Sequence, residues 1–321
     1  LVRRGMSRPK GRTRAVHWAV NICRTTQKFN RFIPDAVEIS RISNTATKMS
    51  NTRAEIRIGT SGYSYEDWVG PFYPESLPRT RRLEYYSHYF SFTEINFSYY
   101  RMPSPRQLGG MVERVPDSFR FSIKAHGSLT HEVGDDWPTQ ARAFAEAVAP
   151  LREAGKLGGV LLQFPFSFHY TPANRRYLDA LCRELAPLPR LLEFRNAEWQ
   201  RDPVYDHMRE LGITNVVTDM PGLRGLPTPQ LRTTSTAAYL RFHGRNEAQW
   251  WKGDNRSRYD YSYRPEELEP WAQGVRELMT QVAIIMVAFN NHANAQAVGN
   301  ARDLQGLLGI PTPSEPPASF P

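Results

Sequence analysis

The chain has 321 residues, of which 40% are hydrophobic and 12% aromatic, so it can build a sizeable core and is neither fibrous nor wholly disordered. The formal net charge is +9, and no run of about 18 uninterrupted apolar residues is present to cross a membrane, so no membrane partner is expected. The two cysteines, Cys23 and Cys182, are too few for a disulfide framework or a four-cysteine zinc site, and a cytoplasmic location is expected.

Residues 1–54 form a basic leader that differs from the rest of the chain. They hold 12 Lys and Arg residues against two acids, whereas the remaining residues hold 29 basic and 30 acidic residues, so the body is nearly neutral. The leader shows no sustained apolar period, and we expect it to be disordered. We favour an over-extended gene start with translation beginning at Met49. A basic arm that contacts nucleic acid and a transit-peptide-like leader are the alternatives.

Eight short β-branched or apolar runs follow in chain order, and helical patterns or turn signals separate them. The expected strands are 55–60, 92–97, 119–125, 159–164, 191–195, 215–219, 238–243 and 284–290. The expected helices lie near 80–90, 104–114, 138–154, 172–186, 203–211, 264–281 and 295–308. The stretch after the sixth strand is rich in Pro and Gly, and it predicts a connection without a helix.

This order of elements predicts an α/β fold, a single-domain (β/α)8 TIM barrel over residues 55–309. The alternative is an open, doubly wound sheet, but the turn after the first strand lacks the GxGxxG phosphate loop typical of that fold. The Pro-rich tail over 310–321 is expected to be flexible.

Polar side chains interrupt the apolar pattern near the ends of several strands. Because side chains alternate along a strand, residues of one parity share a face, and the large apolar residues of the other parity belong against the helices. The charged residues are therefore expected to point inward at the C-terminal mouth, where barrel enzymes have their active sites. They are the cations Lys124, Arg195 and Arg241 and the acids Glu94, Glu193 and Asp219. Since unpaired buried charge is costly, they either form a self-contained ion-pair network or bind a ligand.

Other residues near the same mouth suggest acid–base chemistry more than metal or nucleophilic chemistry. His243 and His131 are candidate general acids or bases, although a lone barrel histidine is more often structural. The loop over 244–263 carries both aromatic and basic residues, which suits stacking on a ligand or a hydrophobic lid. No HExxH, paired-cysteine or GxSxG motif occurs, and three cations would repel a metal. No cofactor is therefore expected, and a divalent metal is left open.

Several short motifs, taken together and in this order, resemble those of the YecE-like family, a TIM-barrel family of unknown function (domain-of-unknown-function family 72). They are Gly59-Thr60-Ser61-Gly62-Tyr63, Glu94-Ile95-Asn96, Tyr100-Arg101, Gln163-Phe164-Pro165, Glu193-Phe194-Arg195, Thr218-Asp219, Arg241-Phe242-His243-Gly244 and Asn290-Asn291. The resemblance implies the barrel, and it implies that Tyr100, Arg101, Lys124, Glu193, Arg195, Asp219, Arg241, His243 and Asn290 are pocket residues. The chain departs from the family pattern in having Tyr63 for Trp, Asn196 for His and Ala295 for Gly.

Three functions are compatible with this pattern, and the first is preferred. It is an enzyme in which Lys124, Arg195 and Arg241 clamp a phosphate or carboxylate of a small anionic substrate. Glu193 or Asp219 would then act as the base, with His243 as the acid or orienting group. The remaining residues expected to bind substrate are Tyr100, Arg101, Asn290, Gln163, Glu94 and His131. The alternatives are a nucleic-acid-processing or -binding barrel, with or without a metal, and a non-catalytic small-ligand sensor. The reaction type and the oligomeric state are left open.

Overall fold

Eight parallel strands form a closed barrel in the computed structural model, which describes residues 54–313 and 320. The strands are β1 (Glu55–Ser61), β2 (Phe92–Ile95), β3 (Arg120–Lys124), β4 (Leu157–Phe164), β5 (Arg190–Phe194), β6 (Thr214–Asp219), β7 (Ala237–Phe242) and β8 (Ile284–Phe289). Each strand pairs in parallel with the next, and β8 pairs with β1. The predicted barrel and its eight strands are confirmed, whereas the predicted disordered leader lies outside the described residues apart from Ala54.

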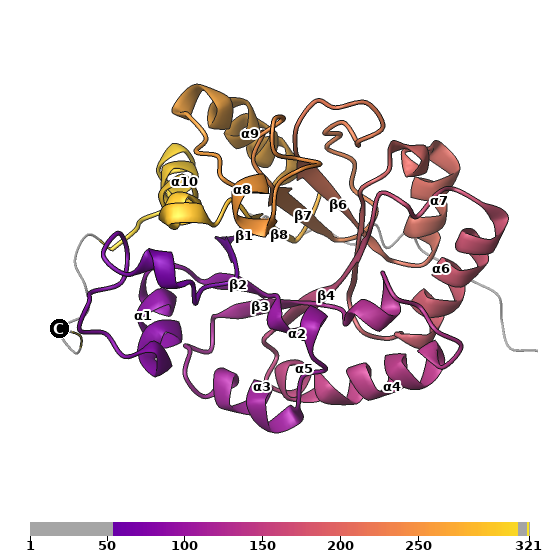
Figure 1. The fold of residues 1–321 in the computed structure, drawn as a ribbon, viewed down its shortest axis with the longest axis horizontal. Coiled ribbons are helices and arrows are strands. Elements are labelled where there is room, and N and C mark those ends of the chain that lie inside the picture. Colours follow the sequence, from indigo (N-terminus) through magenta and orange to yellow (C-terminus); the bar gives the residue numbers. More distant parts are fainter. Residues whose placement is uncertain (1–53, 314–319, 321) are drawn as a thin grey trace, which may run out of the picture. The chain divides into compact units, whose positions relative to one another are not determined.

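Helices surround the strands, as Figure 1 shows. They are α1 (Arg82–Tyr89), α2 (Phe97–Tyr100), α3 (Pro105–Val112), α4 (Trp137–Ala147), α5 (Ala149–Glu153), α6 (Pro172–Glu184), α7 (Asp202–Glu210), α8 (Asn255–Arg258), α9 (Pro265–Leu278) and α10 (Gln296–Leu307). Local capping explains where some begin: the Thr171 hydroxyl accepts a hydrogen bond from the Asn174 amide, and Pro172 fills the first turn of α6. As predicted, the connection between β6 and β7 contains no helix. Within the described residues, none of the helices is both long enough and apolar enough to span a bilayer.

The helices differ from the prediction at two kinds of place. The single helix expected near 138–154 is two helices, α4 and α5, that meet at Val148. Pro150 has no amide hydrogen to donate to the carbonyl one turn earlier, so the helix stops and restarts with this proline in its first turn. Two four-residue helices, α2 and α8, were not predicted. One turn is too short to show a helical period.

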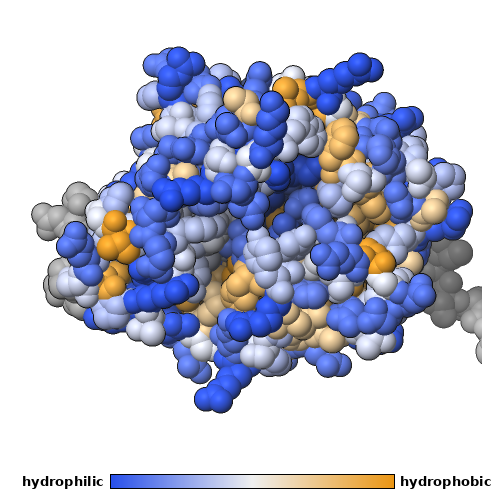
Figure 2. Space-filling view, in the orientation of Figure 1, coloured by the Kyte–Doolittle hydropathy of each residue, from blue (hydrophilic) through white to orange (hydrophobic). Residues whose placement is uncertain are grey.

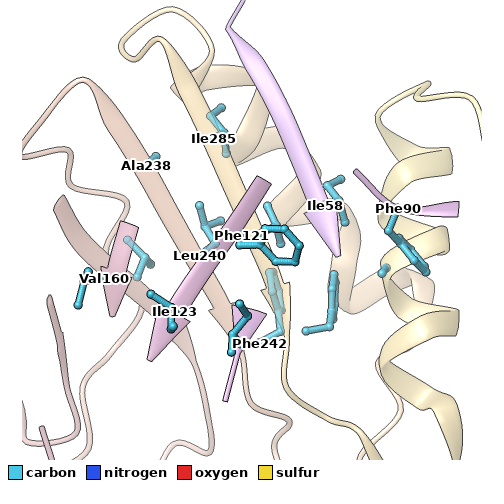
Figure 3. Close-up of a cluster of buried hydrophobic side chains, with 14 of the residues drawn as sticks. Ile58, Phe90, Phe121, Ile123, Val160, Ala238, Leu240, Phe242 and Ile285 are labelled. Atoms are coloured by element: carbon cyan, nitrogen blue, oxygen red, sulfur yellow. The ribbon is translucent and has the colours of Figure 1, made fainter. Parts of the chain in front are cut away.

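The alternation of side chains along the strands divides the core into two layers. Outward-facing residues such as Ile58, Ile123 and Leu240 are buried against the helices (Figure 3). Inward-facing residues form a separate apolar cluster inside the barrel, made of Phe92, Leu161, Leu191, Val216, Tyr239, Met286 and Ala288. This inner cluster fills the barrel below its C-terminal mouth, so the polar residues above it rest on an apolar floor.

Two segments near the C-terminus complete the described structure. Ala295 stands where the family that the sequence resembles usually has Gly. Its φ of 60° lies in the left-handed region that glycine adopts at least cost. At the tail, Ile310 is half-buried on the core, and the Phe320 ring lies 5.4 Å from that of Tyr85. The rest of the predicted tail, 314–319 and 321, lies outside the described residues.

Candidate functional site

The strand register places the polar residues at one level around the mouth of the barrel. Ser61 pairs with Glu94, Glu94 with Ser122, and Gln163 with Glu193. On the far side, Thr218 pairs with Arg241, whose other neighbour is Ala288. Because all eight strands are parallel, their C-terminal ends meet at this level, and the side chains of the inward parity converge there.

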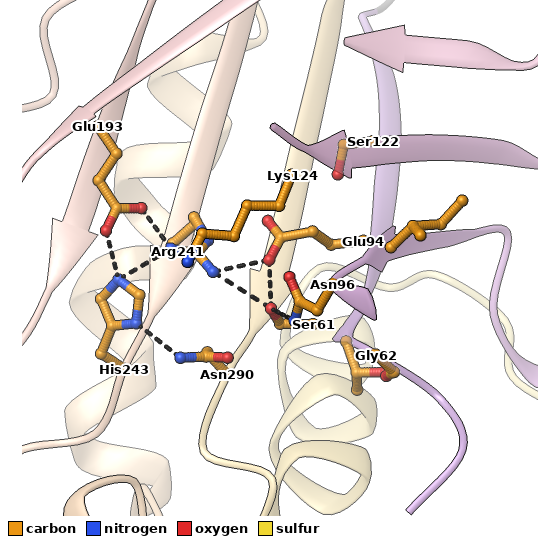
Figure 4. Close-up of polar contacts among 12 residues, drawn as sticks. Ser61, Gly62, Glu94, Asn96, Ser122, Lys124, Glu193, Arg241, His243 and Asn290 are labelled. Carbon is orange, nitrogen blue, oxygen red and sulfur yellow. Dashed lines mark hydrogen bonds and ion pairs between the residues drawn. The ribbon is translucent and has the colours of Figure 1, made fainter. Parts of the chain in front are cut away.

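Glu193 is the centre of the first half of this polar layer. Its carboxylate accepts a hydrogen bond from Arg195 Nε at 2.5 Å. It also accepts one from Arg241 Nη1 and lies 3.2 Å from His243 Nε2 (Figure 4). Burial alone would raise the pKa of Glu193, but Arg241 and Arg195 hold it well below its usual range. Burial and the charge of Arg195 lower the pKa of His243 to about 3. At neutral pH Glu193 is therefore ionised and His243 is neutral.

Glu94 is the centre of the second half, and Arg241 joins the two halves. Arg241 Nη2 lies 2.7 Å from Glu94 Oε1, and Tyr239 donates to Glu94 Oε2 at 2.7 Å. Ser61 also donates to Glu94. Glu94, Glu193 and Arg241 have 0%, 0% and 3% of their surface exposed. Two buried carboxylates thus face two buried guanidinium groups, which matches the ion-pair network that the sequence left as one alternative.

Lys124 is the additional charge that this network does not neutralise. It is the last residue of β3, and its ammonium group has neither a hydrogen bond nor an ion pair within the described part of the chain. Its Nζ lies 4.2 Å from the centroid of the Tyr99 ring. Burial, followed by the nearby charge of Arg241, lowers the pKa of Lys124 to about 7. Figure 4 shows the side chain extending toward Arg241 with no dashed contact.

A cleft of about 1190 Å³ opens above this layer. Figure 2 shows a hollow on this face of the molecule with a largely hydrophilic border. Of the described residues that line the cleft, the charged ones are Arg79, Arg101, Arg114, Lys124, Arg195, Arg241, Arg258 and Glu94. Seven cations against one acid make the cleft electropositive, although the body of the chain is nearly neutral. Aromatic walls come from Tyr65, Phe97, Tyr99, Tyr100, Phe166, Trp250, Trp251 and Tyr259.

All nine residues predicted to bind substrate line this cleft. They are Glu94, Tyr100, Arg101, Lys124, His131, Gln163, Arg195, Arg241 and Asn290. Glu193 and His243, which were predicted to be catalytic, are not among the lining residues; they lie behind the guanidinium groups of Arg195 and Arg241. Asn290 Nδ2 lies 3.0 Å from His243 Nδ1 and so links the lining to this inner pair.

The predicted inward orientation of Asp219 is wrong. Asp219 pairs with Phe242, which packs outward, and therefore has the opposite parity to Thr218 and Arg241. Its carboxylate accepts from Arg245 Nη2 at 2.6 Å, from the Tyr263 hydroxyl at 2.7 Å and from Trp271 Nε1 at 3.1 Å. These partners come from the loop after β7 and from α9. Asp219 thus links the end of β6 to the loop after β7 and to α9 on the outside of the barrel, and it does not line the cleft.

Two lining or supporting residues were missed as members of the site. Burial would raise the pKa of Tyr259, but the charges of Arg195 and Arg241 bring it below its usual value. Tyr259 lies in the loop over 244–263, which starts at Gly244, whose φ of 83° lets the chain turn sharply after His243. Ser61 contacts both Glu94 and Arg241. Its position at the end of β1 was the available signal, whereas nothing in the sequence separates Tyr259 from the other aromatic residues of its loop.

His131 lies on the cleft wall near Lys124. Its Nδ1 is 2.9 Å from the Thr130 hydroxyl, and its ring packs against Tyr99. Burial and the charge of Lys124 lower the pKa of His131 to about 4, so the imidazole is neutral at physiological pH. Among residues 54–313 and 320, no three His, Cys, Asp or Glu side chains are grouped so that they could hold a metal ion.

Comparison with known proteins finds a matching family, similar sequences and similar structures. The model of the family described as "Protein of unknown function DUF72" matches residues 57–319. The protein YunF of Bacillus subtilis is 31% identical over 271 residues, which are 79% of this chain and 95% of YunF. A crystal structure of a DUF72 family protein from Thermotoga maritima is 39% identical with a TM-score of 0.74, covering 79% of this chain and 99% of that one. One from Enterococcus faecalis is 26% identical with a TM-score of 0.73, covering 83% and 100%.

Proposed function

This chain belongs to the DUF72 family of proteins of unknown function, and the name of the family assigns no reaction. From the chain's own cleft, we propose that it is an enzyme acting on a small anionic substrate. The observation that carries the proposal is the imbalance of charge among the described lining residues, seven cations against Glu94. Arg195 and Arg241 are held by carboxylates, but Lys124 and Arg101 have no ion-pair partner in the described structure. A phosphate or carboxylate entering the cleft would supply the missing negative charge.

The same geometry supports a division of labour in the site. Glu193 is ionised, buried and shielded by two arginines, so it serves as their counter-ion and is a poor proton acceptor. His243, neutral and enclosed, orients the same groups. The groups that can reach a substrate and exchange a proton are His131 and Tyr259 on the cleft wall. We assign them as the general base and general acid, with isomerisation or bond cleavage next to a carbonyl as the class of reaction.

Binding of inorganic phosphate tests the anion site. Arg101→Gln and Lys124→Met each remove a charge from the cleft lining, and each is expected to weaken phosphate binding about tenfold, as measured by titration calorimetry. Arg106→Gln is the matched control, because Arg106 is exposed nearby on α3 but does not line the cleft. Unchanged affinity in both lining variants, or equal loss in the control, contradicts an anion site in the cleft.

A second candidate, binding of single-stranded nucleic acid, is favoured by one observation. Of the four large hydrophobic residues exposed in the described structure, three line the cleft: Tyr100, Phe166 and Trp251. Exposed aromatic rings beside arginines are typical of surfaces that stack on bases. They suit a sugar or another ring equally well, so the small substrate remains the preferred ligand. A buried free thiol, Cys182, is in keeping with the cytoplasmic location proposed for either function.

A further inference from the structure

Lysine is rare in this protein, which makes its position in the cleft informative. The chain has 35 arginines but only six lysines, and Lys124, Lys156 and Lys252 are the three within the described residues. Among the described residues, every other cation that lines the cleft is Arg, the better residue for clamping a phosphate or carboxylate. An amine at the end of β3 provides what a guanidinium group cannot, a nitrogen that loses its proton and then acts as a nucleophile.

The backbone holds Lys124 in a fixed place at the floor of the cleft. The Ser98 hydroxyl donates to the Lys124 carbonyl at 2.5 Å, and the next amide, that of Ala125, donates to Leu161 on β4 at 2.9 Å. The side chain passes the Tyr99 ring and ends beside the Arg241 and Glu94 pair. The side chain of Lys156 differs, because its Nζ donates to the carbonyls of Val112 and Val115 on the outside of the barrel.

The groups facing the ammonium favour its neutral form. They are the cations Arg241 and Arg195, the acids Glu193 and Glu94, the Tyr99 ring and the neutral His131. The two acids are already bound by the two arginines, so they do little to stabilise a further positive charge. Burial and the two guanidinium groups bring the pKa of Lys124 to about 7, and a large share of the amine is therefore unprotonated at physiological pH.

We propose that Lys124 is a catalytic nucleophile that forms an imine with an aldehyde or ketone bearing a phosphate or carboxylate group. This inference rests on the proposed function, because the arginines of the cleft hold the anionic end while Lys124 meets the carbonyl carbon. The Nζ lone pair forms the C–N bond, and the carbonyl π pair moves to oxygen, giving a carbinolamine. The C–O bond then breaks as C=N forms, and the oxygen leaves as water with the two hydrogens of the amine.

Pyridoxal 5′-phosphate is a suitable probe because it carries an aldehyde and a phosphate, and its imine absorbs visible light. The full chain is incubated with this probe, reduced with borohydride and digested, and the labelled lysines are identified by peptide mass. We expect Lys124 to be labelled at least tenfold faster than the exposed Lys252, with a rate that reaches half its maximum near pH 7. Inorganic phosphate should protect Lys124. Lys124→Arg, which keeps the charge, should lose the imine absorbance, whereas Lys252→Arg should keep it.

The outcomes separate this inference from the function on which it rests. If Lys252, the more exposed lysine, is labelled faster than Lys124 in the wild-type chain, the proposal that Lys124 is a nucleophile is wrong, even if phosphate binds the cleft. Rapid labelling of Lys124 without protection by phosphate supports the nucleophile and overturns the anion site. The wild-type labelling pattern decides between these outcomes even if the Lys124→Arg chain does not fold.

Discussion

Arg241 occupies the position on which the inner polar network depends. One of its terminal nitrogens contacts Glu193 and the other contacts Glu94, so a single guanidinium group separates two buried carboxylates on opposite sides of the barrel. Arg195 balances the second negative charge. The network is complete without a ligand, and this explains why Glu193 and His243 hold the arginines in place and are not themselves presented to the cleft.

The neutral state of His243 gives a prediction about stability and pH. The folded-state pKa of about 3 lies below the ordinary value of 6.5, so the unfolded chain binds one more proton than the folded chain between these values. The stability contributed by neutral His243 is therefore fully present above about pH 6.5 and is lost as pH falls toward the folded pKa. We expect His243→Asn to reduce the pH dependence of the free energy of unfolding by about 1.4 kcal/mol per pH unit between about pH 4 and pH 6.

Urea unfolding at a series of pH values measures this slope in the wild-type chain and in His243→Asn. His207→Asn removes an exposed histidine on α7 and shows what loss of a surface histidine does to the same slope. Identical slopes in the wild-type chain and His243→Asn would mean that His243 takes up a proton in the folded state.

At the scale of elements, the end of β6 is joined to α9 through Asp219. The carboxylate accepts hydrogen bonds from Arg245, Tyr263 and Trp271, and Arg245 also contacts Glu267 at the start of α9. This junction lies where the β6–β7 connection has no helix to cover the barrel. Side-chain hydrogen bonds therefore link the end of β6 to the loop after β7 and to α9.

Replacing Asp219 distinguishes this structural role from the catalytic role that the sequence predicted. Asp219→Asn removes the charge that faces Arg245 and one acceptor of the cluster, so we expect a loss of about 2 kcal/mol in the free energy of unfolding. Phosphate affinity should change less than twofold, because Asp219 does not line the cleft. Both quantities are measured on the same preparation, by urea unfolding and titration calorimetry. If the Asp219→Asn variant is as stable as the wild-type chain but no longer binds phosphate, Asp219 takes part in binding and its role is not structural.

At the scale of the whole molecule, the barrel was predictable because its signals are repeated and local. Eight strands of four to eight residues stand out as short β-branched or apolar runs, and the parity of Glu94, Lys124, Arg195 and Arg241 correctly places them toward the mouth. Asp219 failed because it ends its strand, where one residue of register decides between the inner and the outer face. The roles of Glu193, His243 and Tyr259 depend on which side chains shield them from the cleft, and a pattern along the chain does not contain that information.

The distribution of charge over the whole chain gives the last prediction. The leader holds 12 of the 41 basic residues, whereas the cleft gathers seven cations in a body whose charges nearly cancel. We expect the full chain to bind a short oligothymidine mainly through the leader, because its many basic residues can release counterions from the nucleic acid. Affinity should then fall steeply with salt, and Trp251→Ala should change it less than twofold.

Base stacking in the cleft would instead contribute about 1–3 kcal/mol per base, so Trp251→Ala would weaken binding at least about fivefold at every salt concentration. Val133→Ala is the matched control, because Val133 is exposed and hydrophobic but lies outside the cleft lining. Fluorescence anisotropy over a range of salt measures all three chains, and a selective loss in Trp251→Ala would put nucleic-acid binding ahead of the small anionic substrate.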